Sequence, residues 1–246
     1  MRVGILSDIH GNLTALDAVL ADLRQQKPDL VFHGGDLAFG GCNPAEVIDC
    51  IAQEGWTGVV GNTDEMLWTA EARLGLEASA PKLRPLFRVL FESSEPATRK
   101  LIGEARLDWL RRLPAELRHE NWVLLHASPG NLWRAPTDTA DDATLETTYK
   151  DLNAGIVVYC HIHRPFTRRV GHMTVCNCGS VGAPYDGDPR ASYLMIDNGR
   201  PAVRRVEYDV EREAQRLLAS GYPHKEWLAE MRRRGTYLQP PEPESD

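Results

Sequence analysis

The chain has 246 residues, of which 42% are hydrophobic and 26% are charged, and its formal net charge is −7. This length and composition indicate one large domain with a substantial core, and the negative charge argues against a general nucleic-acid-binding protein, which needs a basic face to neutralise phosphates. No apolar run approaches the roughly 20 residues that a membrane span requires, and the amino terminus has no signal-peptide pattern, so we expect a cytoplasmic protein without a membrane partner.

The first sixty residues alternate between short apolar runs, which predict strands, and segments with helical spacing. A strand over 3–6 is followed by a helix that Asn12 caps and that ends before Pro28, and a second strand lies over 29–32. This βαβ unit predicts two parallel strands joined by a right-handed crossover. The alternation continues with a helix over 44–53 and a strand over 56–60.

The next sixty residues have helical texture, and we expect no strand between residues 62 and 122. Helical segments are predicted over 65–74, 82–91, 97–102 and 105–113. They form a helical insertion over about 64–118. The insertion either caps a site formed by the neighbouring loops, where it would select substrates, or covers one face of the sheet, and the sequence leaves both arrangements open.

The remainder of the chain is richer in predicted strands. They lie over 122–125, 156–159, 166–170, 174–178, 192–196 and 202–208. Asp197-Asn198-Gly199 is typical of a hairpin turn between the last two strands. Two helices over 210–219 and 224–233 complete a single domain over residues 1–238, and residues 239–246, rich in Pro and Glu, predict a disordered tail.

Five of the apolar runs end just before side chains that bind divalent metal ions. These side chains are Asp8, His10, Asp36, Asn62, His126, His161 and His163. In open α/β sheets ligands gather beyond the carboxyl ends of strands, so five distant segments are expected to converge on one metal site. Asp8 and His10 are two residues apart on backbone that we expect to be extended, which would project both side chains to the same side. The two glycines before Asp36 permit a sharp turn there.

Other residues of the same types are interpreted as structural. His33, His119, His172 and His224 are expected to be packed or surface residues. The five cysteines show no zinc-site or redox spacing, so we expect small packed side chains, Cys176 and Cys178 included. The run Arg232-Arg233-Arg234 is interpreted as a solvated helix face.

The order of the motifs resembles that of the calcineurin-like metallophosphoesterase superfamily, and more closely its bacterial and archaeal phosphodiesterase-like branch. The motifs are Asp8-Ile-His10, Gly35-Asp36, Gly61-Asn62-Thr63-Asp64, His126 and Cys160-His161-Ile-His163, with Asn177-Cys-Gly-Ser-Val-Gly-Ala-Pro and Asp188-Pro-Arg-Ala-Ser-Tyr193 in support. The resemblance covers residues 2 to about 200. It implies a four-layer αββα sandwich of two mixed β-sheets flanked by helices.

The resemblance also implies a dinuclear metal centre. One divalent ion would be held by Asp8, His10, Asp36 and His163, and the other by Asp36, Asn62, His126 and His161, with Asp36 bridging. Asp36, Asn62 and His10 would be catalytic as well. The nitrogen and oxygen ligands fit Mn, Fe, Zn, Co or Ni. A bridging hydroxide would attack small phosphodiesters or phosphomonoesters, so no Ser or Cys nucleophile is needed.

The alternatives that share this fold are a protein phosphatase, a dinucleoside polyphosphate hydrolase and a non-catalytic scaffold. The presence of all seven ligand residues argues against the scaffold. The natural substrate is left open, as is the oligomeric state, a homo-oligomer included. Manganese is one of several metals that the ligand set would accept.

Thr63 is the one departure from the family pattern, because many members carry His there. A hydroxyl cannot protonate a leaving group as imidazolium can, so we expect a preference for acidic leaving groups. Asn12 and Arg164 are placed to contact substrate phosphate. For Arg134 and Arg190 a structural salt bridge is the favoured interpretation.

Overall fold

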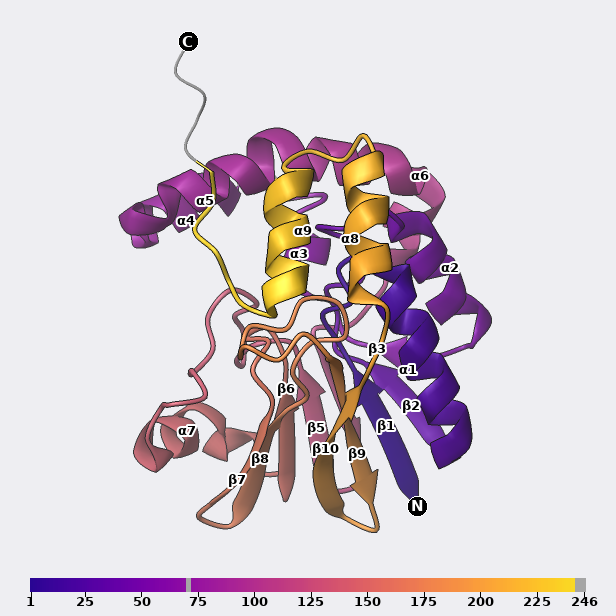
Figure 1. Ribbon diagram of the computed structural model, residues 1–246. Helices are drawn as coiled ribbons and strands as arrows, with labels where there is room; N and C mark the ends of the chain where they lie inside the picture. The colour runs from indigo at the N-terminus through magenta and orange to yellow at the C-terminus, as the bar shows by residue number, and fades with distance from the viewer. Residues whose placement is uncertain (70–71, 242–246) are drawn as a thin grey trace.

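The computed structural model describes residues 1–69 and 72–241. Its centre is a sandwich of two five-stranded sheets, with strand orders β10-β9-β1-β2-β3 and β4-β5-β6-β8-β7 (Figure 1). In the first sheet β1, β2 and β3 are parallel, while β9 and β10 are antiparallel to their neighbours. In the second sheet β5, β6 and β8 are parallel and the two edge strands are antiparallel. Both sheets are mixed, which confirms the predicted fold class.

The strands are short and close to the predicted positions. The first sheet contains β1 (Arg2–Leu6), β2 (Leu30–His33), β3 (Thr57–Gly58), β9 (Ala191–Asp197) and β10 (Arg200–Val206). The second sheet contains β4 (Glu116–His119), β5 (Trp122–Leu125), β6 (Ile156–Tyr159), β7 (Phe166–Val170) and β8 (Met173–Asn177). The turn between β9 and β10 places Asn198 and Gly199 at φ 49° and 74°, as the hairpin signal predicted.

Two strand predictions were wrong. β4 lies in the region where no strand was expected, because this edge strand is half exposed and its polar sequence, Glu-Leu-Arg-His, contains no apolar run. β3 is shorter than the predicted 56–60, because the chain leaves the sheet at Val60. The amide of Val60 donates to the carbonyl of Pro114 instead of to a strand.

The core of the sandwich consists of apolar side chains from the facing surfaces of the two sheets. Ile5 and Phe32 of the first sheet pack with Leu124 and Val158 of the second. The buried thiols of Cys160, Cys176 and Cys178 belong to the same cluster. They are packed side chains, as the sequence indicated.

Helices cover the outer faces of both sheets. The helices on the first sheet are α1 (Leu13–Gln26), α2 (Pro44–Gln53) and α6 (Glu95–Arg111), and α7 (Asp142–Tyr149) covers the second. Asn12 caps α1 by accepting a hydrogen bond from the amide of Ala15 at 2.9 Å. This arrangement is the expected four-layer αββα sandwich. The C-terminal helices α8 (Val210–Ala219) and α9 (Lys225–Arg234) pack against each other.

The helical insertion crosses the end of the sandwich opposite the amino terminus (Figure 1). It consists of α3 (Asn62–Glu65), α4 (Ala72–Ser79), a 3₁₀ turn (Pro81–Leu83), α5 (Arg84–Arg88), a π-helical turn (Val89–Ser94) and α6. The predicted helix over 65–74 was wrong, since α3 ends at Glu65; residues 70–71 lie outside the described part of the chain. The predicted break near residue 103 corresponds to a kink in α6, where Gly103 has φ 69°.

The structure bears on two further predictions about the chain as a whole. No helix among the described residues is long and apolar enough to cross a membrane. Of the predicted tail over 239–246, residues 242–246 lie outside the described part of the chain, and residues 239–241 have no regular secondary structure.

Candidate metal centre

The seven candidate ligands all follow the carboxyl ends of parallel strands. Asp8 and His10 follow β1, Asp36 follows β2, and Asn62 begins α3 just after β3. His126 follows β5, and His161 and His163 follow β6. Because these strands are parallel within each sheet, their carboxyl ends share an edge, and the two edges meet at one end of the sandwich.

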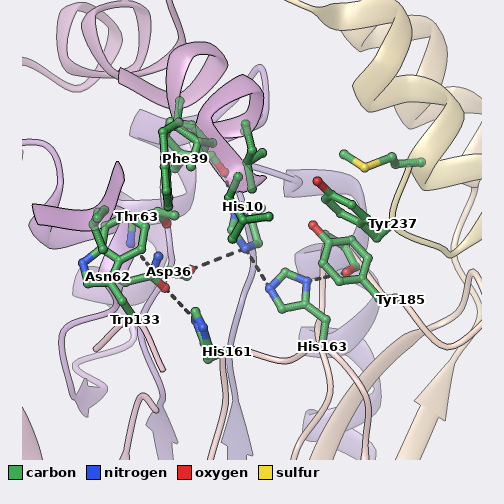
Figure 2. Close-up of a pocket in the computed structure, with 18 of the residues that line it drawn as sticks. His10, Asp36, Phe39, Asn62, Thr63, Trp133, His161, His163, Tyr185 and Tyr237 are labelled. Atoms are coloured by element: carbon green, nitrogen blue, oxygen red, sulfur yellow. Dashed lines mark hydrogen bonds and ion pairs between the residues drawn. The ribbon is translucent and has the colours of Figure 1, made fainter. Parts of the chain in front are cut away.

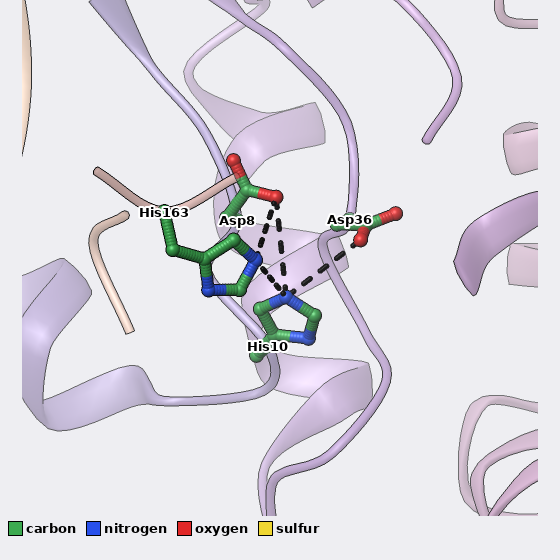
Figure 3. A group of neighbouring side chains, drawn as sticks. All are labelled: Asp8, His10, Asp36 and His163. Atoms are coloured by element: carbon green, nitrogen blue, oxygen red, sulfur yellow. Dashed lines mark hydrogen bonds and ion pairs between the residues drawn. The ribbon is translucent and has the colours of Figure 1, made fainter. Parts of the chain in front are cut away.

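The first group of ligands is Asp8, His10, Asp36 and His163. Each offers one ligand atom, these atoms all lie within 4.8 Å of one another, and all four side chains are buried (Figure 3). The Nε2 atom of His163 lies 3.1 Å from Oδ1 of Asp8, and Nε2 of His10 lies 3.7 Å from Oδ2 of Asp36. Three or four histidine and aspartate ligands for one ion are ordinary for a transition-metal site.

Hydrogen bonds to the backbone assign the tautomers of the two histidines in this group. Nδ1 of His10 donates to the carbonyl of Phe39 at 2.7 Å, and Nδ1 of His163 donates to that of Ala183 at 2.6 Å. Both Nε2 atoms therefore carry lone pairs, yet they lie only 3.2 Å apart. Oδ1 of Asp8 is buried beside them and accepts no hydrogen bond from any residue that the structure describes. Three bare acceptors that face one another fit a bound cation.

The second group is Asn62, His126 and His161. Oδ1 of Asn62 lies 2.8 Å from Nε2 of His126 and 2.9 Å from Nδ1 of His161. Nδ1 of His126 donates to the carbonyl of Gly34 at 2.7 Å, which again turns Nε2 inward. These donor atoms form a second set of nitrogen and oxygen ligands beside the first.

Asp36 lies between the two groups. Its Oδ2 atom faces His10, and its Oδ1 atom lies 3.6 Å from Nε2 of His126. The amide of Thr63 donates to Oδ1 at 2.9 Å and fixes the carboxylate in this orientation. The two carboxylate oxygens of Asp36 therefore face the two groups of candidate ligands.

The pKa values of the candidate ligands are shifted in both directions. Burial opposes ionisation of Asp8, but the imidazoles of His163, His126 and His10 outweigh it and hold the pKa of Asp8 below its usual range. Burial and the neighbouring His163 lower the pKa of His10, while burial and His126 lower the pKa of His161 to about 3. Burial raises the pKa of Asp36, and although burial opposes protonation of His126, Asp36 and Asp8 outweigh it and raise the pKa of that imidazole. At neutral pH the imidazoles of His10 and His161 are therefore neutral with free lone pairs, as metal ligands must be.

Five of the seven candidate ligands have left-handed backbone. The φ angles are 53° for Asp8, 51° for His10, 53° for Asp36, 67° for His161 and 58° for His163. Non-glycine residues adopt this region rarely and at an energetic cost, and such residues cluster at functional sites. The expectation of extended backbone at Asp8 and His10 was wrong, because β1 already ends at Leu6. The same geometry lets His161 and His163 point to different groups, where simple strand alternation would have sent them the same way.

Two glycines provide space at the centre. Gly35 has φ 87°, which permits the sharp turn expected before Asp36. A Cβ atom on Gly61 would lie 2.0 Å from Oδ1 of Asp36, so no larger residue fits there without moving the carboxylate.

Asp64 was quoted in a motif but assigned no role from the sequence, and it holds the metal loops together. Its carboxylate accepts hydrogen bonds from the amides of Asp36 at 2.7 Å, Leu37 at 3.0 Å and Gly61 at 3.2 Å. Burial and the nearby Asp36 raise the pKa of Asp64 to about 7. The one sequence signal was its place in the quoted motif, two residues after the candidate ligand Asn62.

A family comparison identifies the group of proteins that carries this centre. The family model for the calcineurin-like phosphoesterase superfamily domain matches residues 1–200. The chain belongs to the calcineurin-like phosphoesterase superfamily. The resemblance noted in the sequence motifs is thereby confirmed.

Similar proteins span nearly the whole chain. An uncharacterised protein from Methanocaldococcus jannaschii is 28% identical over 253 residues, which cover 93% of this chain and 96% of that protein. A metallophosphoesterase from Sphaerobacter thermophilus is 25% identical, with a TM-score of 0.78 over 96% of this chain and 100% of that one. A hypothetical protein from Pyrococcus horikoshii OT3 has a TM-score of 0.81 at 19% identity, covering 96% of this chain and 99% of that one, and shares the fold.

A cavity of about 330 Å³ opens beside the centre of this superfamily member. His10, Asp36, Asn62, His161 and His163 border it, and Thr63 lines it next to them (Figure 2). The insertion contributes further walls through α4, α5 and the π-helical turn, while α6 packs on the outer face of the first sheet. By position, α4, α5 and the π-helical turn fit the first of the two arrangements that the sequence left open, and α6 fits the second. Selection of substrates by the insertion stays a prediction.

The two residues predicted to contact substrate in this superfamily fold do not line the cavity. Asn12 is fully buried, and its side chain caps α1 and donates to the carbonyl of Gly182 at 3.1 Å. Arg164 is half exposed and lies 3.9 Å from the carboxylate of Asp138. Arg190 forms the expected salt bridge, with Asp188 at 2.7 Å. Arg134 lines the cavity, and within residues 1–69 and 72–241 no carboxylate lies within 4.0 Å of its guanidinium.

One interpretation of the arginine run was wrong. Arg232 is 1% exposed and lines the cavity, while Arg233 and Arg234 are solvated and pair with Glu211 and Glu230. The reason is the helical period: successive residues of a helix point in different directions, so Arg232 points toward the core while Arg233 and Arg234 point toward solvent. Nη2 of Arg232 donates to the carbonyls of His10 at 3.3 Å and Gly40 at 3.0 Å.

The remaining histidines stay apart from the centre. His33 is fully buried, and His224 lies 2.8 Å from Oγ of Ser93 through its Nε2 atom. His119 is half-buried and stacks on Trp122, and His172 is exposed in the turn between β7 and β8. None of them belongs to the metal-ligand group found among the described residues.

Proposed function

We propose that this protein is a metal-dependent phosphoesterase that hydrolyses small phosphodiesters or phosphomonoesters at a dinuclear centre. The observation that supports this most is the position of Asp36, whose two oxygens face separate groups of nitrogen and oxygen ligands. A bridging carboxylate between two ligand sets is the usual way to hold two ions close together.

Each ion would have a ligand set of its own in addition to the shared Asp36. Asp8, His10 and His163 would hold one ion, and Asn62, His126 and His161 the other. Borderline nitrogen and oxygen ligands suit Mn, Fe, Zn, Co or Ni. When bound, two such ions lower the pKa of a water between them and neutralise charge on the phosphate during in-line attack.

The residues of the chain would position these components. The carbonyls of Phe39, Gly34 and Ala183 hold His10, His126 and His163 with Nε2 facing inward. Outer hydrogen bonds of this kind orient metal ligands and raise their basicity. Thr63 borders the cavity where an acid would stand, so the ester oxygen would leave without a proton from this side chain.

The test begins with elemental analysis of protein purified without added metal, which we expect to find about two transition-metal ions per chain. Turnover of bis(4-nitrophenyl) phosphate is then measured with each candidate metal. Asp36→Asn should lower kcat/KM at least a hundredfold, because the amide cannot bridge as a carboxylate does. Asp108→Asn, an exposed carboxylate on α6, is the matched control and should leave activity unchanged. Metal-independent turnover, or none with any metal, would falsify the proposal.

A further inference from the structure

The cavity beside the centre has polar groups on its floor and apolar groups on its walls. The floor consists of the candidate metal ligands, and the walls rise from the insertion and from α9. The insertion contributes Leu76, Leu86 and Leu90 to the walls, and α9 contributes Trp227 and Met231. At about 330 Å³ the cavity lies within the range of pockets that bind small organic ligands.

Aromatic side chains stand on both sides of the metal ligands. Figure 2 shows Phe39 and Trp133 on one side and Tyr185 and Tyr237 on the other. Their neighbours hold them in place: Trp133 stacks on Phe91 with ring centroids 6.2 Å apart, and Tyr185 stacks on the ring of His163 at 4.3 Å. The walls are therefore packed surfaces that exist before any ligand enters.

The charges in the cavity are few and close to the floor. Among the described lining residues Asp36 is the one acidic side chain, and Arg134 and Arg232 are the cationic ones. A phosphate on the floor would meet the positive charge, and any group attached to it would extend toward leucine and aromatic side chains. Water against such walls is displaced favourably by apolar groups.

We propose, on the basis of the phosphoesterase function above, that the substrate is a phosphate ester with at least one bulky apolar ester group, aromatic or aliphatic. The cavity binds that group between the leucines of the insertion and the aromatic side chains, while the floor binds the phosphate. The insertion thus determines which esters bind, and the metal ligands determine what happens to them.

Binding of phosphonates to the metal-loaded protein tests this without turnover, because the C–P bond is not hydrolysed. Isothermal titration calorimetry with methyl-, hexyl- and phenylphosphonate should give Kd values at least tenfold lower for the hexyl and phenyl compounds than for the methyl compound. Each buried methylene contributes about fourfold to affinity, so a tenfold gain needs only part of the group inside the cavity. Equal Kd values for all three would overturn the inference, and this comparison needs only the wild-type protein.

Leu86→Asn tests the wall directly. Leu86 lines the cavity and is half-buried, whereas Leu101 on α6 is 47% exposed, does not line the cavity and provides a matched control. Leu86→Asn should raise the Kd of phenylphosphonate about tenfold and leave that of methylphosphonate unchanged. Leu101→Asn should change neither. An equal loss for both ligands in Leu86→Asn would contradict the proposed contact.

The two proposals fail separately. If no ester is hydrolysed but the larger phosphonates still bind more tightly, the catalytic proposal is wrong and the apolar binding site remains. If esters are hydrolysed and the three phosphonates bind alike, only the assignment of the cavity is wrong.

Discussion

The Nε2 atoms of His10 and His163 lie 3.2 Å apart, and each ring has already committed its Nδ1 proton to a backbone carbonyl. When both rings are neutral, no proton is left to join the two nitrogens, so their lone pairs oppose each other in a buried position. A divalent cation between them would convert this repulsion into two coordinate bonds. Folding and metal binding should therefore be strongly linked.

The first prediction concerns thermal stability. After chelation, adding the native metal at about a hundred times its Kd should stabilise the protein by about 2.7 kcal/mol, or roughly 5 to 10 °C in Tm for a chain of this size. His163→Gln should abolish most of this shift in differential scanning calorimetry. His172→Gln, which changes an exposed histidine, should retain it. The same shift in both variants would exclude His163 as a ligand.

The second prediction concerns Asp64, which touches no proposed ion but accepts amide hydrogen bonds from Asp36, Leu37 and Gly61. Asp64→Asn offers one acceptor oxygen in place of two, so at least one buried amide loses its partner, at a cost of about 1 to 3 kcal/mol in unfolding free energy. Metal affinity should fall about 10- to 100-fold, as for other residues that orient ligands. Denaturant titration and metal titration measure the two effects.

The control for Asp64 is Asp108→Asn, because Asp108 is exposed and pairs with Arg111 on the helix surface. Its unfolding free energy should stay within about 0.5 kcal/mol of the wild type. If Asp64→Asn behaved like this control, the three amide hydrogen bonds would have no role in holding the loops.

The sequence predicted the convergence of the ligands because strand ends are marked by apolar runs, and parallel strands bring their ends together. It could not predict how His161 and His163 divide between two groups, since this depends on the left-handed φ angles of 67° and 58°. β4 was not predicted because it is a half-exposed edge strand whose sequence contains no apolar run, and an edge strand can form without one. Arg232 was assigned to a solvated face because a charged side chain is usually exposed. Only the tertiary fold shows that this face of the helix packs against the cavity.

The third prediction concerns Thr63, which stands where many family members have His. Its Oγ1 atom is buried and has no hydrogen-bond partner among the residues that the structure covers. The wild type should hydrolyse aryl phosphates clearly and alkyl monoesters poorly, and Thr63→His should raise kcat on alkyl esters, with a ceiling set by the usual 10²- to 10⁴-fold value of general acid catalysis.

The control for Thr63 is Thr63→Val, which removes the hydroxyl group without adding an acid. It should keep the wild-type dependence of rate on the leaving-group pKa. Equal wild-type rates on aryl and alkyl esters would show that leaving-group protonation is supplied elsewhere.

The fourth prediction concerns His33 and pH. His33 is fully buried, no described residue bonds to either ring nitrogen, and burial lowers its pKa to about 3. Below about pH 6.5 the unfolded state binds a proton at His33 that the folded state does not. The free energy of unfolding therefore decreases by about 1.4 kcal/mol for each pH unit by which the solution is acidified below that value. Between pH 7.5 and pH 5 this contribution is about 2 kcal/mol.

His33→Leu should remove that contribution. In urea titrations the wild type should lose about 2 kcal/mol more than this variant between the two pH values. His172→Leu, at an exposed site, should follow the wild type. Identical losses in wild type and His33→Leu would mean that His33 is not held neutral in the fold.

The last prediction concerns Arg232, whose guanidinium is buried at the edge of the cavity and bonds only to the carbonyls of His10 and Gly40 among the described residues. A buried cation without a carboxylate partner is costly to the fold, and its position beside the proposed phosphate site supports a role in anion binding. Arg232→Met keeps most of the side-chain bulk and removes the charge. The inhibition constant of inorganic phosphate should rise about 10- to 100-fold, since a hydrogen bond to a charged group contributes about 1.5 to 3 kcal/mol. Arg233→Met, one residue further and paired with Glu211 in solvent, should leave that constant unchanged. Equal effects of the two substitutions would place the charge of Arg232 outside the phosphate site.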